Sequence, residues 1–186
     1  MPFTETGFPG LLIYDPIVYG DDRGYFFESY NKQNFLKGNV DIIFVQDNQA
    51  RSVYGVVRGL HFQKDPHSQT KLIRVLEGNI LDVAVDLRNG SPTYGKVYTI
   101  ELSAENKKQL LVPQGFAHGY SVLSETAEVF YKCDRFYNKE TEGGLAYSDP
   151  ALAIDWKIPP EKMILSPKDI VHPVLSECPH NFVYYP

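Results

Sequence analysis

The chain has 186 residues, of which 43% are hydrophobic and 22% charged, and its formal net charge is −5. This length suits one domain with a full core and leaves little room for two, so we expect a single domain over residues 1–186. Lys and Arg are scattered along an acidic chain, which excludes the basic patch of a nucleic-acid-binding protein.

Cysteine content and apolar run length bear on the compartment. Cys133 and Cys178 are the only cysteines, too few for a disulfide framework, and they predict free thiols in a reducing compartment. The first ten residues lack the basic start and apolar run of a signal peptide. No apolar run is long enough for a membrane span. We therefore expect a cytoplasmic protein with no membrane partner.

Most of the chain as far as residue 138 consists of short segments rich in Val, Ile, Tyr and Phe, separated by Gly, Pro or Asn. This pattern is typical of an all-β sandwich or barrel. A short helix is expected at 32–37. The expected strands are residues 11–18, 24–30, 42–50, 53–62, 70–77, 80–87, 95–102, 108–112, 118–124 and 126–133.

Two of these strands carry a more detailed prediction. Glu77-Gly78-Asn79 separates strands 70–77 and 80–87, and its composition predicts a hairpin turn between them. Within 80–87, apolar residues occupy one face and Asp82 and Asp86 the other. This alternation predicts a half-buried strand.

The chain changes character after residue 138. Gly143-Gly144 and several Pro-containing pairs follow, among them Asp149-Pro150 and Pro159-Pro160. These pairs disfavour regular strands. We expect a loop-rich C-terminal tail with short helices that wraps over the sandwich.

The strongest local motif lies at residues 55–63. It resembles the first sequence motif of the cupin superfamily, small β-barrels of the jelly-roll type. Gly55 and His61 fit that motif. Gln63, however, stands where the motif has its second His, and Lys71 stands where it has its Glu.

Residues 113–119 resemble the second cupin motif, Pro-x-Gly-x-x-His, which is complete and ends at His118. Metal-binding cupins hold the ion with three His and one Glu. A protonated lysine repels a divalent ion and has no lone pair to give it. With Gln63 and Lys71 at two of the four positions, we expect a pocket without metal, in which an ammonium stabilises negative charge on a substrate oxygen.

Strand parity shows which of these residues point inward. Lys71 and Tyr131 each share a face with apolar residues of their own strands, which favours an inward orientation. Arg58 and His61 are three positions apart, so a regular strand points them to opposite faces. A bulge at Gly59 would bring them to the same side.

Each candidate also has a structural interpretation. A histidine in a β-protein is usually structural, and His67, His172 and His180 are interpreted in this way. A lone Lys on an apolar face fits a buried stem with a solvated head. Only the combination of residues favours a functional site.

That combination resembles one family within the cupins, the dTDP-4-dehydrorhamnose 3,5-epimerases. The resemblance covers roughly residues 7–170 and is most specific where the segments are taken together. The segments that carry it are residues 22–28, 46–48, 55–63, 69–72, 82–88, 91–95, 113–119, 131–132 and 149–150.

The resemblance implies a cupin-type jelly-roll β-sandwich that works as a homodimer without metal or cofactor. It implies a dTDP-4-keto-6-deoxyhexose as substrate, with C3 and C5 inverted in turn. Both carbons lie next to the C4 ketone, so their protons can be removed if the enolate is stabilised. The expected product of dTDP-4-keto-6-deoxyglucose is dTDP-4-keto-L-rhamnose.

The resemblance also implies roles for individual residues. His61 is the expected base, since the pKa of a histidine lies near working pH. Asp169 is the expected residue that orients it, although any carboxylate near His61 could serve. Lys71 is expected to stabilise the enolate, and Tyr131 to return a proton on the opposite face.

Substrate contacts follow from the same resemblance. Arginines suit the diphosphate because a guanidinium binds phosphate oxygens in a bidentate manner. Residues from the N-terminal part of one subunit are expected to reach the partner's site. The expected substrate-binding residues are Arg23, Glu28, Gln46, Asp47, Asn48, Arg58, His118, Glu142 and Lys168.

Four alternatives stay open at this point. One is an epimerase that acts at C3 only, because it would share the base, the lysine and the tyrosine. Another is a ketoisomerase that acts on a similar sugar nucleotide. The others are a sugar-nucleotide-binding protein without catalysis and a metal-dependent cupin oxygenase.

Overall fold

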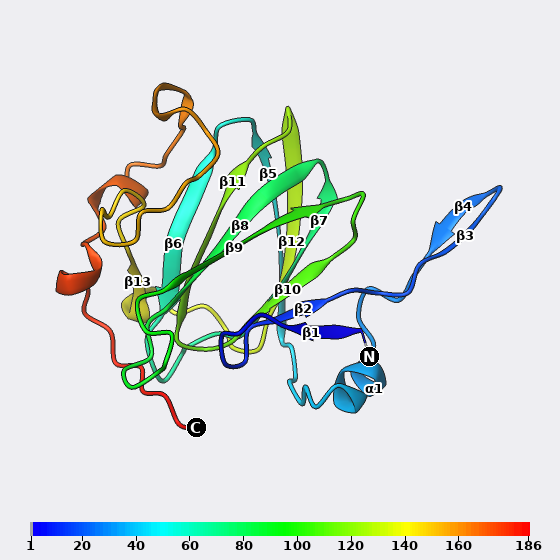
Figure 1. Ribbon diagram of the computed structural model, residues 1–186, viewed down its shortest axis with the longest axis horizontal. Coiled ribbons are helices and arrows are strands. Elements are labelled where there is room, and N and C mark those ends of the chain that lie inside the picture. Colours follow the sequence, from blue (N-terminus) through cyan, green and yellow to red (C-terminus); the bar gives the residue numbers. More distant parts are fainter. Residues whose placement is uncertain (1) are drawn as a thin grey trace.

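The computed structural model describes residues 2–186, which form two antiparallel β-sheets packed against each other and a projecting hairpin (Figure 1). The six-stranded sheet has the order β1 (Phe3–Glu5), β2 (Leu12–Tyr14), β10 (Gln109–Val112), β7 (Lys71–Glu77), β12 (Thr126–Cys133) and β5 (Gln46–Val53). The five-stranded sheet has the order β13 (Glu142–Gly144), β6 (Val57–Gln63), β11 (Phe116–Val122), β8 (Asn79–Asp86) and β9 (Val97–Ser103). The hairpin, β3 (Tyr19–Asp21) and β4 (Gly24–Phe26), extends away from both sheets, and residues 15–28 are called the arm below.

The main core lies between the two sheets, as expected for a β-sandwich. Ile73 and Val75 of β7 point into it from one sheet, and Ile80 and Ala84 of β8 point into it from the other. Long crossovers bring together strands that are far apart in sequence, such as β2 beside β10. The predicted all-β jelly-roll sandwich is therefore confirmed.

The α-helix α1 (Lys32–Lys37) has the predicted boundaries. Asn31 caps it, because its side chain accepts hydrogen bonds from the backbone N–H groups of Gln33 and Asn34. Phe35 of this helix packs with Leu72 and Leu111 on the outer face of the six-stranded sheet. Among residues 2–186, no helix has the length and apolar character that a membrane span requires.

The predicted hairpin at Gly78 is wrong. β7 pairs with β10 and β12 in one sheet, whereas β8 pairs with β9 and β11 in the other. Gly78 therefore carries the chain from one sheet to the other. Its φ of +74° favours glycine, so the turn signal was real, but a turn residue does not specify which strands pair.

The prediction of a half-buried strand at 80–87 is also wrong, because β8 is covered on both faces. Asp82 and Asp86 point to the inner side of the five-stranded sheet and are fully buried. Leu81, Val83 and Val85 point to the outer side and are buried under the C-terminal part of the chain. The alternation in the sequence correctly separated the two faces but could not show what covers the outer one.

The covering segment is residues 138–186, here called the strap. It runs along the side of the sandwich that lies opposite the arm (Figure 1). Leu145, Leu152, Trp156 and Phe182 pack on the outer face of the five-stranded sheet. As predicted, the strap is mostly irregular, with short 3₁₀ helices, η1 (Lys139–Thr141), η2 (Pro160–Lys162), η3 (Asp169–Val171) and η4 (Leu175–Glu177).

The expectation that this segment has no strand is wrong at β13. This edge strand pairs with β6, and Gly144 lies opposite His61. A Cβ at Gly143 would lie 2.4 Å from the ring of Phe62. The two glycines, which suggested a loop, instead allow the edge strand to lie close over β6.

Candidate active site

A cavity of about 430 Å³ lies where the two sheets and the strap meet. A second cavity of about 190 Å³ adjoins it, and His61, Lys71 and Tyr131 line both. The six-stranded sheet contributes Lys71 and Tyr131, and the five-stranded sheet contributes His61 and His118. The strap contributes Asp169. The structure thus brings the four predicted catalytic residues together from three separate parts of the fold.

A bulge in β6 brings Arg58 to the same cavity as His61. On the neighbouring strand β11, His118 pairs with His61 and Tyr120 pairs with Arg58, so three steps on β6 match two steps on β11. Gly59 lies within this shift, with φ of +114°. A Cβ there would lie 2.6 Å from the Cα of Gly119, so this close approach requires glycine.

His61 and Asp169 form a close pair. His61 Nε2 lies 2.5 Å from Asp169 Oδ1, and the carboxylate is almost completely buried. Burial raises the pKa of Asp169, but the hydrogen bond and the charge of His61 outweigh it, so the pKa lies below its ordinary value. Because Asp169 engages Nε2, the Nδ1 atom of His61 is the nitrogen left to accept a proton.

Backbone hydrogen bonds at Ile164 hold this part of the strap against β6. Ile164 N donates to Gly55 O over 2.8 Å, and Val57 N donates to Ile164 O over 2.9 Å. Five residues later, Asp169 begins η3, and its backbone N–H donates to Ser166 Oγ. This anchor places the carboxylate beside β6, a contact between residues 108 positions apart.

Lys71 and Tyr131 approach from the opposite sheet, on neighbouring strands. Burial lowers the pKa of Lys71, and the negative charges of groups that include Asp82 and Glu142 oppose this effect. Burial raises the pKa of Tyr131 to about 12, so its phenol keeps its proton at neutral pH. The site therefore offers a base on one sheet and a proton donor on the other.

A second His–Asp pair lies deeper in the sandwich. His118 Nε2 lies 2.8 Å from Asp82 Oδ1, and both side chains are buried. Among the described residues, the other oxygen of Asp82 has no hydrogen-bond partner. The pair fixes the orientation of the His118 ring at the wall of the cavity.

The predicted substrate-binding residues divide into groups. Gln46, Asn48 and Glu142 line the smaller cavity, and Lys168 lines the larger one and pairs with Glu142. Asp47 lies on the other face of β5, where it forms an ion pair with Lys132 over 2.8 Å. The structure therefore places Asp47 outside both cavities.

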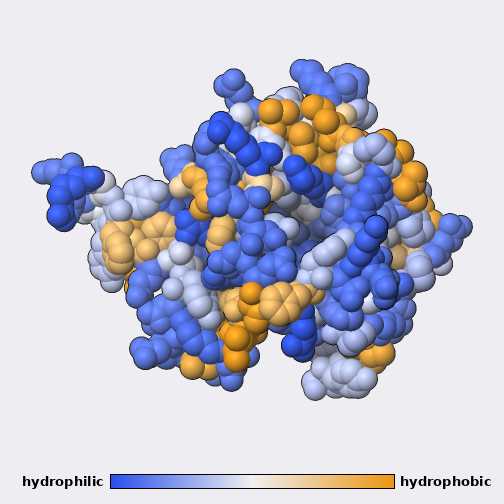
Figure 2. All heavy atoms as spheres, turned by 180° about the vertical axis from the view of Figure 1, so that it is seen from behind, coloured by the Kyte–Doolittle hydropathy of each residue, from blue (hydrophilic) through white to orange (hydrophobic). Residues whose placement is uncertain are grey.

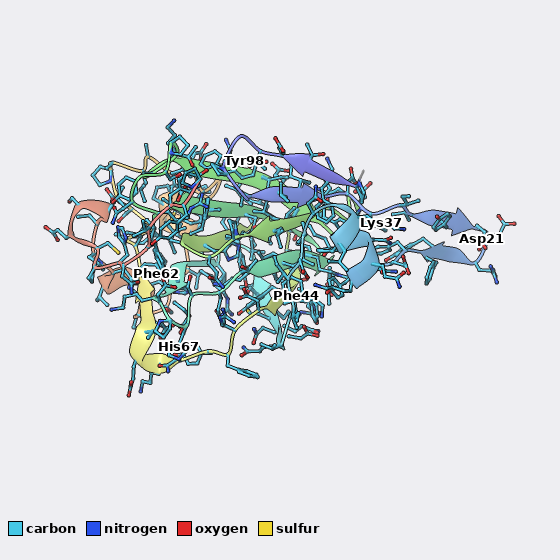
Figure 3. All side chains as sticks on the ribbon, turned by 90° about the horizontal axis from the view of Figure 1, so that it is seen from below. Asp21, Lys37, Phe44, Phe62, His67 and Tyr98 are labelled. Carbon is cyan, nitrogen blue, oxygen red and sulfur yellow. The ribbon has the colours of Figure 1, made fainter. Side chains whose placement is uncertain are left out.

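Arg23 and Glu28 also lie away from the cavity. Arg23 is at the tip of the arm, where it is 89% exposed and paired with Asp21. Figure 3 shows Asp21 at the far end of the arm, well beyond Lys37 of α1. Glu28 lines a separate hollow of about 400 Å³ at the base of the arm. Seen from behind, the arm ends in a hydrophilic tip (Figure 2).

Sequence reasoning missed several residues around the site. Tyr137 lines the smaller cavity, and its hydroxyl donates to Glu142. Asp82 was interpreted only as the polar face of a strand, although it holds His118. His172, interpreted as structural, lies with its Nε2 4.0 Å from Asp169 Oδ1. No spacing rule marks these residues, since each approaches the site through tertiary contacts.

The ligand set of a metal-binding cupin is not assembled here. The side-chain oxygen of Gln63 instead accepts hydrogen bonds from Asn138 N and Thr141 Oγ1. Lys71 occupies the cavity wall at the position of the acidic ligand. The donor set at these positions therefore does not suit a divalent ion.

Comparison with known proteins adds an independent observation. Residues 5–177 match the family model described as dTDP-4-dehydrorhamnose 3,5-epimerase. The dTDP-4-dehydrorhamnose 3,5-epimerase of Shigella flexneri is 48% identical over 171 residues, which cover 91% of this chain and 93% of that protein.

Two solved structures show the same fold. The dTDP-4-dehydrorhamnose 3,5-epimerase of Elizabethkingia anophelis is 53% identical with a TM-score of 0.90, over 94% of this chain and 96% of that one. A dTDP-6-deoxy-D-glucose-3,5-epimerase of Legionella pneumophila, solved with dTDP-4-keto-L-rhamnose, is 45% identical with a TM-score of 0.90. The match covers 94% of this chain and 93% of the Legionella pneumophila chain.

Proposed function

This chain belongs to the dTDP-4-dehydrorhamnose 3,5-epimerase family, and from this premise we propose that it is an isomerase that inverts C3 and C5 of dTDP-4-keto-6-deoxyglucose. The product is dTDP-4-keto-L-rhamnose, an intermediate of dTDP-rhamnose biosynthesis. The observation that carries the proposal is the single cavity in which the His61–Asp169 pair faces Lys71 and Tyr131.

His61 removes the proton from the substrate. A proton on C3 or C5 is acidic because the electrons left behind spread onto the C4 oxygen. Nδ1 of His61 accepts this proton while Nε2 stays hydrogen-bonded to Asp169. The buried carboxylate holds the ring in one orientation and stabilises the imidazolium that forms.

Lys71 stabilises the enolate that forms. Its ammonium lines the same cavity and is shielded from bulk water, where a charge interaction is stronger than in water. The effect of burial on its pKa also favours hydrogen-bond donation to the enolate oxygen. His118, held by Asp82, adds a second polar group on the wall of the cavity.

Inversion requires that the new proton arrive on the face opposite the one that lost its proton. His61 and Tyr131 stand on different sheets, with the cavity between them. The high pKa of Tyr131, about 12, keeps the phenol protonated until the enolate forms. Proton transfer from Tyr131 then completes the inversion.

The nucleotide half of the substrate extends toward the smaller cavity and the rim. Arg58 lines the main cavity and donates to Ser52 Oγ, so its guanidinium is positioned for the diphosphate. Gln46, Asn48 and Glu142 offer polar contacts next to it. These groups bind the part of the substrate that does not react.

We propose a homodimer in which the arm of one protomer completes the site of the other. In a single protomer, the arm, which carries Arg23 between β3 and β4, lies on the opposite side of the molecule from the strap (Figure 1). The arm also exposes Ile17, Tyr19, Tyr25 and Phe26, each more than 60% exposed. Such an apolar surface on a projecting hairpin favours burial against a partner.

The proposed reaction moves only protons, so it needs no cofactor and no metal. Its substrate is a soluble sugar nucleotide, and Cys133 and Cys178 are free thiols. Both points support a cytoplasmic location.

Solvent exchange tests the proposed function. The purified protein is incubated with dTDP-4-keto-6-deoxyglucose in heavy water, and deuterium is located by NMR. Label at both C3 and C5 is expected. Label at C3 alone would identify the single-site epimerase, and no label with intact binding would identify a binding protein.

A further inference from the structure

Three side chains of metal-ligand type meet at the edge of the cavity. The donor atoms of His61, Asp169 and His172 lie within 4.8 Å of one another. Asp169 Oδ1 is 2.5 Å from His61 Nε2 and 4.0 Å from His172 Nε2. The two rings meet edge to face with centroids 5.6 Å apart. The proposed reaction uses His61 and Asp169 but gives His172 no role.

His172 is held in place although no hydrogen bond explains its position. Among residues 2–186, its buried Nε2 has no hydrogen-bond partner, a state that is unfavourable for a buried polar group. Its ring packs on the backbone at Gly144, where a Cβ would lie 2.5 Å from Nε2. Its Nε2 therefore lies 4.0 Å from Asp169 Oδ1 with no hydrogen bond between them.

The η3 turn places the two proposed ligands of the strap, Asp169 and His172, on the same side of the turn. Asp169 begins η3, and His172 follows its last residue. Residues three apart in a 3₁₀ turn lie one above the other. His61 faces them from β6, on a strand paired on both sides. The three donors therefore belong to two well-anchored elements.

We propose that a divalent transition-metal ion, with Zn²⁺ as the best fit, binds His61, Asp169 and His172 and inhibits the enzyme. Two imidazoles and one carboxylate form a typical three-ligand zinc set, with the fourth position left open. Of the three ligands, His61 and Asp169 also line the main cavity. The inhibition rests on the proposed function, whereas the binding does not.

The distances suit the ion after small side-chain rotations. Zinc bonds of about 2.0–2.2 Å in a tetrahedral site hold the ligand atoms about 3.3 Å apart. The pair of His61 and Asp169, now at 2.5 Å, has to open, and the pair of His172 and Asp169, at 4.0 Å, has to close. Each of these two changes is less than about 1 Å. The donors of His61 and His172, which lie within 4.8 Å of each other, close toward the same spacing.

This site differs from the metal site of cupins. The cupin ion would need donors at Gln63 and Lys71, where this chain has an engaged amide and an ammonium. The proposed ion instead binds the Nε2 side of His61, on the side of the strap. Lys168 and Glu142 are the other charged groups near His172, and they pair with each other.

Binding at this position would stop proton abstraction. The ion takes the Nε2 lone pair of His61 and replaces the hydrogen bond to Asp169. The ring proton of neutral His61 then resides on Nδ1, the nitrogen that otherwise accepts the substrate proton. No bond to the substrate and no redox change is involved, so removal of the ion restores the base.

Metal titration tests the proposal without relying on activity. The full-length protein is first treated with a chelator and dialysed, then titrated with Zn²⁺ by calorimetry and with Co²⁺ by visible absorption, which reports tetrahedral coordination. The variants are His172→Ala, His172→Gln and His180→Ala. His180 is the matched control, because it is another partly buried histidine of the strap. Circular dichroism checks that each variant is folded.

One Zn²⁺ per chain is expected in the wild type and in His180→Ala. Both His172 variants should bind Zn²⁺ at least about tenfold more weakly than the wild type does. In the heavy-water assay, Zn²⁺ should suppress exchange by the wild type and a chelator should restore it, while His172→Ala keeps its basal exchange and resists Zn²⁺.

Equal Zn²⁺ affinity in wild type and both His172 variants would overturn the site, and activation of exchange by the metal would overturn the inhibition. If the metal binds as described but the metal-free protein exchanges neither proton, the proposed function fails and the binding site stands. If both protons exchange and no metal binds, the proposed function stands and the proposed metal site fails.

Discussion

His61, Lys71 and Tyr131 stand on strands that are paired on both sides by backbone hydrogen bonds. Asp169 instead stands in an irregular part of the strap, which backbone hydrogen bonds at Ile164 join to the five-stranded sheet. In the sandwich, register decides where a side chain points. In the strap, burial of Trp156 and its apolar neighbours on the five-stranded sheet holds the segment in place. The proposed reactive groups thus have a rigid scaffold, whereas the proposed orienting carboxylate depends on the backbone hydrogen bonds at Ile164 and on the side-chain packing of the strap.

The proposed base and its partner can therefore be lost in separate ways. A change in the sandwich should remove the chemistry, and a change in the strap should remove the orientation of the base or the stability of the protein. The following substitutions distinguish these two kinds of loss.

His61→Ala removes the base from the sandwich side. Exchange at C3 and C5 should fall by about 10³-fold or more, because no other group at that position accepts the proton. Affinity for dTDP should change little, since the nucleotide contacts lie elsewhere. Exchange kinetics and calorimetry with dTDP measure the two effects. Near wild-type turnover in this variant would defeat the mechanism.

Trp156→Ala loosens the strap from the outer face of the sheet. Trp156 is buried, and its Nε1 donates to Tyr147 O. Loss of a buried tryptophan should lower the free energy of unfolding by about 3–5 kcal/mol, as measured by denaturant titration. Tyr185→Ala is the control, because Tyr185 is on the same strap but 81% exposed. A similar loss in both variants would mean that packing at Trp156 does not hold the strap.

Asp169→Asn keeps the shape of the strap but removes its negative charge. Exchange should fall roughly 10²-fold while dTDP affinity stays unchanged. Asp82→Asn alters the matched pair within the sandwich and should lower exchange much less. Equal losses in the two variants would argue against the specific role of Asp169.

The same substitution has a pH signature. The pKa of Asp169 lies below its ordinary value of 3.8, so the carboxylate stabilises the native state above that pH. This contribution is lost as pH falls through the lower folded-state pKa. The wild type should therefore lose stability more steeply than Asp169→Asn below about pH 4, as denaturant titrations at several pH values would show.

Arg23→Ala tests the third region, the arm. Arg23 is highly exposed, so stability should stay within about 0.5 kcal/mol of wild type, while substrate affinity falls. A mixture of Arg23→Ala and His61→Ala subunits should regain about a quarter of wild-type activity, because half of the dimers then contain one intact site. If the mixture stays inactive after subunit exchange, the arm does not complete the partner's site.

Much of the sandwich could be predicted from the sequence because strand alternation and turn residues are local signals. The strands around Lys71 and Tyr131 and the helix at Lys32–Lys37 follow from such signals. β1, β3 and β13 have three residues each. Three residues are too few to show the two-residue alternation of a strand in the sequence. Gly78 marked a turn, yet which strands pair with each other depends on contacts between residues that lie far apart in the sequence.

Local sequence patterns were enough for the all-β class and the inward direction of Lys71 and Tyr131, and they marked Gly59 as the position of the bulge that Arg58 and His61 need in order to share a side. Local sterics and the two-residue period of a strand are sufficient for these features. Only the tertiary structure decided that Asp169 is the carboxylate beside His61 and that His172 lies next to both. It also placed Arg23 outside its own protomer's cavity. These arrangements depend on how the strap and the arm pack against or project from the sandwich, which no local pattern encodes.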